Sequence, residues 1–281
     1  MDTGKLYLVP TPIGNLKDIT LRALEILKEV DIIAAEDTRQ SLRLLNHFDI
    51  KKPLISYHQH NENSKGENLL QRLKNGENIA LVTDAGTPGI SDPGSVIVLR
   101  CIEEGLPFEV LPGATAVTTA LVYSGLDTSA FIFRGFIPRE NKERRFLVDE
   151  LKDRRETIIF YEAPHRLRET LSFLKENFNG RNIAICRELT KLHEEIIRVN
   201  IENAVKYYEE NEPRGEYVLV LQGKSEEEII KDKQSLWEHL TIEEHIIKYV
   251  NEGLSKKEAV KKVAKERNMP KSEVYEHSID L

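Results

Sequence analysis

The chain has 281 residues, of which 40% are hydrophobic and 31% are charged. That length predicts two domains at roughly 150 residues each. Its net charge of −7 argues against indiscriminate coating of nucleic acid, although a local basic face stays possible. Cys101 and Cys186 are too few for a disulfide scaffold or a cysteine-based zinc site, so the sequence predicts a reducing, cytoplasmic setting. It shows neither a signal peptide nor an apolar run of roughly 20 residues, so we expect no secretion and no membrane span.

In the first part of the chain, short apolar runs alternate with helical patterns, which is typical of an α/β fold with a largely parallel sheet. We expect strands at 6–9, 32–35, 54–56, 79–82 and 108–111. Helices are expected after the cap residue Thr20, after Ser64 with its capping-box partner Glu67, over 95–104, and from about 116 to Ser124.

A second set of elements follows Gly125. Strands are expected at 131–133, 158–161, 183–186, 194–199 and 217–221, and helices around 141–152, 166–177 and 201–211. Past Gly223 only helices are expected, beginning near 242, near 256 and after Pro270, the first two with capping boxes. The sequence therefore predicts an α/β domain over 1–124, a second over 125–223, and a helical module over 224–281.

The loop over 83–94 is the strongest candidate for a ligand-binding wall. It holds three glycines, two prolines and two aspartates in twelve residues and follows a strand. Glycine lets backbone approach a ligand closely and proline stiffens the loop. In an open parallel sheet, ligands bind beyond the carboxyl ends of the strands. No dinucleotide or Walker A motif is present, and His58 with His60 lacks further ligands at recognisable spacing, so we expect surface histidines and no metal.

Basic residues gather near the C-terminus, where residues 253–271 hold seven basic and two acidic side chains. Lys256, Lys257 and Lys261 belong to this segment, whose spacing resembles a helix-turn-helix. The local excess of positive charge favours contact with nucleic acid. The alternative is a helical packing cap with an exposed lysine face.

Four motifs in order resemble one family. They are Val9 to Thr20 (VPTPIGNLKDIT), Ala35 to Arg39 (AEDTR), the 83–94 loop, and Phe160 to Arg166 (FYEAPHR). They are similar to motifs of the bacterial 16S rRNA cytidine 2′-O-methyltransferases of the tetrapyrrole methylase superfamily. The resemblance covers nearly the whole chain and includes the shorter segments Pro112 to Ala114, Arg187 to Lys191 and Arg214 to Glu216. It implies two α/β domains of the class III type, S-adenosylmethionine bound in the cleft between them, and a homodimer.

The same resemblance implies which residues contact the cofactor. These are Thr11, Pro12, Gly14, Asp84, Ala85, Gly86, Thr87, Ile90, Gly113, Ala114, Thr115, Tyr161, Glu162 and Ala163. Thr87 stands where many relatives have aspartate, and the tetrapyrrole-specific glycine-rich loop is replaced by Pro10 to Asn15. That replacement points away from tetrapyrrole substrates.

The catalytic candidates are ionisable residues at predicted strand ends: Glu36, Arg39, His58 and Glu188. Arg39, Arg166 and Arg187 are types that bind phosphate, and we expect Glu36 and Arg39 to face the entering nucleotide. For each of these residues a salt bridge or a helix cap is the alternative. The general base is not assigned.

The leading hypothesis is 2′-O-methylation of a cytidine in 16S rRNA of the small ribosomal subunit, the cytidine numbered 1402 by custom. One alternative is a small-molecule methylase acting on a tetrapyrrole or a related metabolite. The other is a noncatalytic RNA-binding assembly factor.

Overall fold

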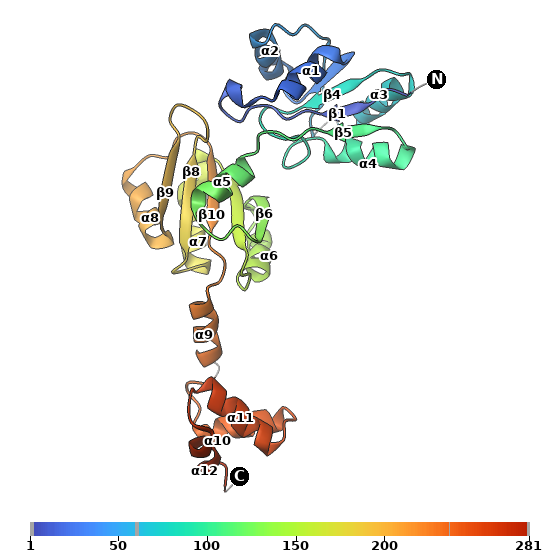
Figure 1. Cartoon of the computed structure of the whole chain (residues 1–281). Helices are drawn as coiled ribbons and strands as arrows, with labels where there is room; N and C mark the ends of the chain where they lie inside the picture. Colours follow the sequence, from blue (N-terminus) through green and yellow to red (C-terminus); the bar gives the residue numbers. More distant parts are fainter. Residues whose placement is uncertain (1–2, 60–61, 236, 280–281) are drawn as a thin grey trace. The chain divides into compact units, whose positions relative to one another are not determined.

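The computed structural model describes residues 3–59, 62–235 and 237–279. The chain forms two compact units, Met1–Gly223 and Lys224–Leu281. The larger unit contains two five-stranded sheets with helices packed against them (Figure 1). The α/β class predicted from the sequence is confirmed.

The first sheet is entirely parallel and has the order β3-β2-β4-β1-β5. Its strands are β1 (Leu6–Leu8), β2 (Ile32–Ala35), β3 (Leu54–Ser56), β4 (Ile79–Val82) and β5 (Phe108–Val110). Alternate strand residues point to opposite faces. One face packs on α1 (Leu21–Glu29) and α2 (Thr38–His47), and the other on α3 (Glu62–Lys74) and α4 (Ser95–Glu104). All five strands therefore end at the same edge.

Two helices in this part differ from the sequence-based expectation. The helix α2 was not expected, because its sequence holds only three leucines among polar residues. Asp37 caps it by accepting a hydrogen bond from the Arg39 amide. α3 begins at Glu62, so Ser64 is inside the helix and is not its cap. The Glu62 carboxylate accepts a hydrogen bond from the Gly94 amide, which ties the start of α3 to the 83–94 loop.

The second sheet has the order β6-β7-β10-β8-β9. Its strands are β6 (Phe131–Phe136), β7 (Thr157–Glu162), β8 (Asn182–Arg187), β9 (Glu195–Asn200) and β10 (Tyr217–Leu221). Only the β6–β7 pair of this sheet is parallel; the other three pairs are antiparallel. The parallel arrangement expected for the first part of the chain therefore does not extend to this sheet. The loop 188–194 joins β8 directly to β9 without a crossover helix, and β10 pairs antiparallel between β7 and β8.

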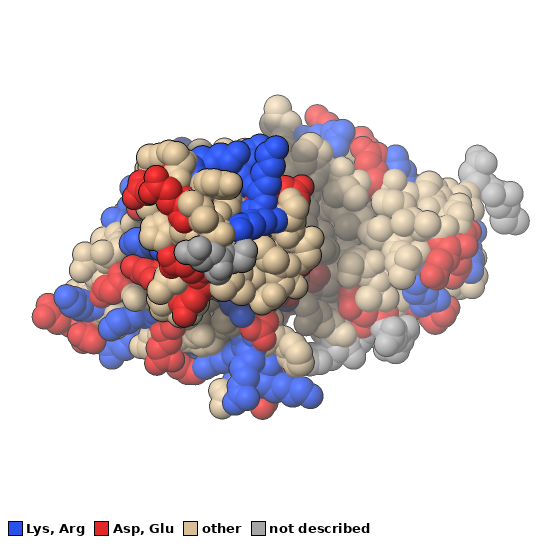
Figure 2. Space-filling view, turned by 90° about the horizontal axis from the view of Figure 1, so that it is seen from below, with Lys and Arg blue, Asp and Glu red and all other residues tan. Residues whose placement is uncertain are grey.

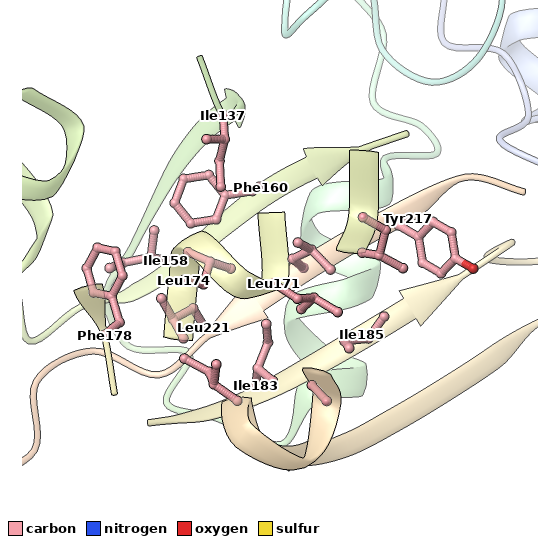
Figure 3. Packing of buried hydrophobic residues seen from close by; sticks show 14 of the residues in the cluster. Ile137, Ile158, Phe160, Leu171, Leu174, Phe178, Ile183, Ile185, Tyr217 and Leu221 are labelled. Carbon is pink, nitrogen blue, oxygen red and sulfur yellow. The ribbon is translucent and has the colours of Figure 1, made fainter. Parts of the chain in front are cut away.

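One face of the second sheet is covered by α6 (Asn141–Leu151), α7 (Leu167–Asn177) and α8 (Ile201–Glu210). Figure 3 shows Phe160, Leu171 and Leu174 meeting in this core. The other face packs against α5 (Ala116–Ser124) through Val117 and Leu121. By side-chain packing, α5 belongs with the second sheet. The division between the two sheets therefore precedes α5, whereas the domain boundary was expected after it, between residues 124 and 125.

The smaller unit contains α9 (Glu226–Ser235), α10 (Ile242–Asn251), α11 (Lys256–Glu266) and α12 (Lys271–Glu276). Both expected capping boxes are present, Thr241 with Glu244 and Ser255 with Glu258. Each cap is worth about 1 kcal/mol. Buried Ile246, Val260 and Val274 give this module a core of its own. Among the described helices of the whole chain, none is long and apolar enough to cross a membrane.

Candidate functional site

The loops that follow β1 and β4 are joined at the carboxyl edge of the first sheet. Thr11 and Gly86 form an antiparallel bridge, in which each amide donates to the other's carbonyl at 2.9 and 3.0 Å. Gly86 has a φ of +82°, a conformation that favours glycine. The Thr87 hydroxyl donates to the Ala114 carbonyl at 3.1 Å. The loops after β1, β4 and β5 thus form one continuous wall.

A first cavity of about 500 Å³ lies between this wall and the second sheet. It is in the size range of small-molecule sites. Several residues predicted to contact the cofactor line it: Asp84, Ala85, Gly86, Thr87, Ile90, Thr115, Tyr161, Glu162 and Ala163. Its apolar wall includes Ile13, Phe136, Leu189 and Val218. Burial raises the pKa of Tyr161 to about 12.

Carboxylates dominate the charge of the first cavity. Burial raises the pKa of Glu36, and the neighbouring Asp92 and Asp84 raise it further. Burial likewise raises the pKa values of Asp84 and Asp92. Lys191 is the one basic side chain among the described lining residues, and its ammonium binds Glu188 at 2.9 Å and Glu216 at 2.7 Å. This cavity therefore favours a cationic ligand.

Glu162 is almost fully buried at the end of β7. Its carboxylate accepts hydrogen bonds from the Ala163 amide at 2.8 Å and from the Thr170 hydroxyl at 2.5 Å. Arg166, in the short helix η2 (Pro164–Arg166), lies 3.6 Å from the same carboxylate and donates to the Ile137 carbonyl. Its side chain is only 12% exposed. Arg166 therefore holds this loop in place, where the sequence suggested a phosphate ligand.

A second cavity of about 490 Å³ lies on the other side of the loop after β1. Thr11, Pro12 and Gly14, which were predicted to contact the cofactor, line this cavity and not the first. One face of α2 completes it with Gln40, Ser41, Arg43, Leu44 and His47. The two cavities share five wall residues: Ile13, Asp84, Ala85, Lys191 and Glu216.

The loop 188–194 crosses the loop after β1 at Gly14. A Cβ atom on Gly14 would lie 2.5 Å from Lys191 Cγ and 2.7 Å from the Leu189 carbonyl oxygen. The Asn15 amide donates to the Thr190 hydroxyl at 3.1 Å. Glu188 and Thr190 have φ values of +50° and +64°, which are uncommon for residues other than glycine. We call this contact the Gly14 crossing.

Glu188, a catalytic candidate, supports the Gly14 crossing and lines neither cavity. Its carboxylate accepts hydrogen bonds from the Lys191 ammonium at 2.9 Å and from the Glu216 amide at 2.8 Å. Burial raises its pKa, but these two hydrogen bonds outweigh burial and lower it overall. Burial lowers the pKa of Lys191, and its bonds to Glu216 and Glu188 raise it overall. Lys191 is therefore a fixed cation.

The remaining predicted residues lie away from both cavities. The Arg39 side chain is 87% exposed and pairs with Asp37 at 2.7 Å. Half-buried His58 lines neither cavity. Arg187 donates to the Arg214 carbonyl at 2.8 Å and pairs with Glu195 at 3.3 Å. Gly113 packs against Pro10, and Ala114 contributes its carbonyl to Thr87. Of the four catalytic candidates, only Glu36 lines a cavity described here.

Sequence reasoning missed Asp92, Lys191, Glu216 and Arg43 as lining residues. Asp92 lies in the loop that was singled out, and Lys191 and Glu216 belong to motifs that carried the resemblance. Arg43 had no such signal. Within the described parts of the chain, no group of three or more His, Cys, Asp or Glu side chains could hold a metal ion. His60 lies outside the described residues.

Comparison with known families agrees with this geometry. Residues 5–205 match the family described as Tetrapyrrole (Corrin/Porphyrin) Methylases. The chain belongs to this family, as the resemblance predicted, and it is an enzyme of the methyltransferase class.

Two relatives that match most of the chain have the same name. A Bacillus subtilis (strain 168) protein named ribosomal RNA small subunit methyltransferase I is 51% identical over 275 residues, which cover 98% of this chain and 94% of that protein. A Thermotoga maritima protein of the same name is 47% identical over 221 residues, which cover 79% of this chain and 99% of that protein.

Solved structures with low sequence identity share the fold. Diphthine synthase superposes with a TM-score of 0.64 at 16% identity and covers 79% of this chain and 91% of its own. Uroporphyrin-III-C-methyltransferase from Thermus thermophilus gives a TM-score of 0.56 at 21% identity and covers 77% and 94%. At these identities the likeness shows a shared fold alone.

The Gly14 crossing makes a prediction about packing. Gly14→Ala should destabilise the protein by about 1–3 kcal/mol, because the new methyl group would overpack a contact with the Leu189 carbonyl oxygen, the Thr190 hydroxyl and Lys191 Cγ. Urea unfolding followed by circular dichroism measures the change. Gly66→Ala is the matched control, since its Cβ would meet only the flexible Arg100 side chain at 3.3 Å. Equal unfolding free energies for both variants would mean that the crossing yields easily.

The raised pKa of Glu36 makes a prediction about pH. A folded-state pKa above the ordinary 4.5 means that folding disfavours the ionised carboxylate, so wild-type stability falls as pH rises through this pKa. Glu36→Gln should therefore be more stable than wild type at pH 7. The gain should vanish below about pH 4, where the carboxyl group is protonated in the folded and the unfolded protein. Urea titrations at several pH values measure it, with exposed Glu29→Gln as control; a gain that persisted at low pH would contradict the electrostatic cause.

Proposed function

We propose that this enzyme transfers a methyl group from S-adenosylmethionine to the 2′-hydroxyl of a cytidine in 16S rRNA. The customary number of that cytidine is 1402. The supporting observation is the acidic, partly apolar first cavity in a chain 51% identical to a relative named ribosomal RNA small subunit methyltransferase I. The replaced glycine-rich loop argues against a tetrapyrrole substrate.

The first cavity fits S-adenosylmethionine by its chemistry. The cofactor is a sulfonium cation with a purine and an amino acid group, and it supplies an activated methyl group when bound. Glu36, Asp84 and Asp92 would provide the negative potential that a cation needs, and Ile13, Ile90 and Tyr161 would provide apolar surface for the purine. Gly86 lines the same cavity with backbone alone.

Positioning is the larger part of the catalytic task. Holding the hydroxyl in line with the methyl group can contribute about 7–11 kcal/mol in well-oriented cases. A general base adds roughly 10²–10⁴-fold. We assign Glu36 to the reaction site, as an electrostatic partner of the sulfonium. His58, Glu188, Arg166 and Arg187 would act through the loops that they hold, since none of them lines either cavity.

The helical module would add affinity for RNA. Lys257 and Lys261 are one turn apart on the exposed face of α11, and exposed Lys256 is adjacent. Figure 2 shows Lys and Arg side chains gathered in blocks on one face, with Asp and Glu side chains beside them. The Thermotoga maritima relative matches only 221 residues of this chain, close to the length of the larger unit. This supports an accessory role for the module, with methyl transfer in the larger unit.

Two further expectations belong to the proposal. The family resemblance implies a homodimer, which light scattering would measure. The substrate implies a cytoplasmic reaction, because bacterial ribosomal subunits are assembled there.

A transfer assay tests the proposed function. Purified enzyme with labelled S-adenosylmethionine should transfer about one methyl group per unmethylated small subunit, and mass spectrometry of the rRNA should place it on one cytidine ribose. Subunits that already carry the methyl group should accept none. Label in a tetrapyrrole without RNA would favour the small-molecule methylase, and no transfer to any ribosomal particle would favour an assembly factor.

The role of the module is tested by its lysines. Replacing Lys256, Lys257 and Lys261 by glutamine should weaken subunit binding and lower the salt dependence of log affinity by about 0.7–0.9 for each phosphate that is no longer neutralised. Affinity for S-adenosylmethionine should not change. The control replaces exposed Lys28, Lys51 and Lys175 of the larger unit. If both triple variants had the same salt dependence, the module would be a packing cap.

A further inference from the structure

We propose that the second cavity is the subsite for the target nucleotide, and that Arg43 binds a phosphate of the RNA there. This inference rests on the proposed function, because it concerns the substrate of that reaction. It assigns a site that the sequence motifs did not indicate.

The two cavities differ in charge. The first has five acidic lining residues, Glu36, Asp84, Asp92, Glu162 and Glu216, against Lys191 alone. The second has two acidic lining residues, Asp84 and Glu216, balanced by Arg43 and Lys191. A sulfonium cofactor needs negative potential and an RNA strand needs positive potential. The acidic first cavity therefore suits the cation, and of the two cavities the second, which is balanced in charge and holds Arg43, suits the phosphate better.

Arg43 is an unused cation at the second cavity. It is exposed and makes no hydrogen bond or ion pair with any residue that the structure describes. By contrast, Arg39 on the same helix pairs with Asp37. Gln40, Arg43, Leu44 and His47 share one face of α2, as their spacing of three and four residues requires. A free guanidinium can bind phosphate through two parallel hydrogen bonds.

The shared wall explains how substrate and cofactor would meet. Asp84 and Ala85 leave the end of β4, and Lys191 reaches the same place from the Gly14 crossing. The hydroxyl can take the methyl group only in direct contact with it, so the ribose would lie where the two cavities adjoin, beside these shared residues. Arg43 lies on α2, away from the shared residues. Its part is to position the nucleotide through the phosphate.

Arg43→Ala tests the subsite in the full-length enzyme. The KM for unmethylated small subunits should rise about tenfold, because the variant cannot make the charge-assisted hydrogen bonds to phosphate. The calorimetric Kd for S-adenosylmethionine and the kcat at saturating subunits should stay at wild-type values. Arg43→Lys should recover part of the KM, since it restores the charge without the planar fork. Arg22→Ala is the matched control: Arg22 is exposed on α1 and lies 3.5 Å from Glu109.

Each outcome either supports or overturns the proposed subsite. A KM for Arg43→Ala equal to that of Arg22→Ala overturns the subsite, as does a tenfold weakening of cofactor affinity. A KM effect of Arg39→Ala in place of Arg43→Ala would move the phosphate site to the start of α2 and also overturn it. If wild-type enzyme transfers no methyl group, the proposed function fails separately; filter binding of the same subunits then measures whether Arg43 holds RNA. Unchanged cofactor binding shows that each variant is folded.

Discussion

The contact between Gly14 and the residues Leu189 to Lys191 joins the first sheet to the second. Only a residue without a side chain fits there, and the approaching loop reaches it by holding Glu188 and Thr190 at positive φ. Such conformations cost of order 1–3 kcal/mol each and persist where surrounding bonds over-determine them. Here the Asn15–Thr190 hydrogen bond and the pairing of Lys191 with Glu188 and Glu216 do so. The result is a thin wall with a cavity on each side.

The first cavity brings several carboxylates close together, where folding disfavours their ionised forms. Glu36, Asp84 and Asp92 gather around the first cavity, and each has a pKa raised chiefly by burial. A neutral residue of similar shape would avoid the desolvation of the ionised form. Ionised carboxylates become favourable there when a cation is bound, because the negative potential that the three carboxylates create together attracts the cation. If the cationic cofactor proposed above binds there, the lower stability of the free enzyme would be coupled to its binding.

Local features of the fold could be predicted from the sequence, whereas contacts between distant segments could not. The density of Gly and Pro in residues 83–94 predicted a wall, and parallel strands brought its neighbours to the same edge. By contrast, the insertion of β10 between β7 and β8 depends on pairing between distant segments. Arg166 has the chemistry of a phosphate ligand, yet burial against Glu162 and Ile137 gives it a structural role. Pattern alone cannot tell a buried arginine from a free one such as Arg43.

An acidic chain can still bind RNA if its charges are separated in space. The net charge of −7 is a sum over the whole chain. Carboxylates line the first cavity, whereas exposed cations lie on one face of α2 and on the surface of α11. Screening limits exposed charges to about 8–10 Å at physiological salt, so a phosphate at Arg43 responds to the local field and not to the net charge. Arg43 would then set the position of one nucleotide, and the lysines of α11 would add affinity that carries no sequence information. Such a separation agrees with the Thermotoga maritima relative, which matches only 221 residues of this chain, since a reaction site confined to the larger unit would not need the module.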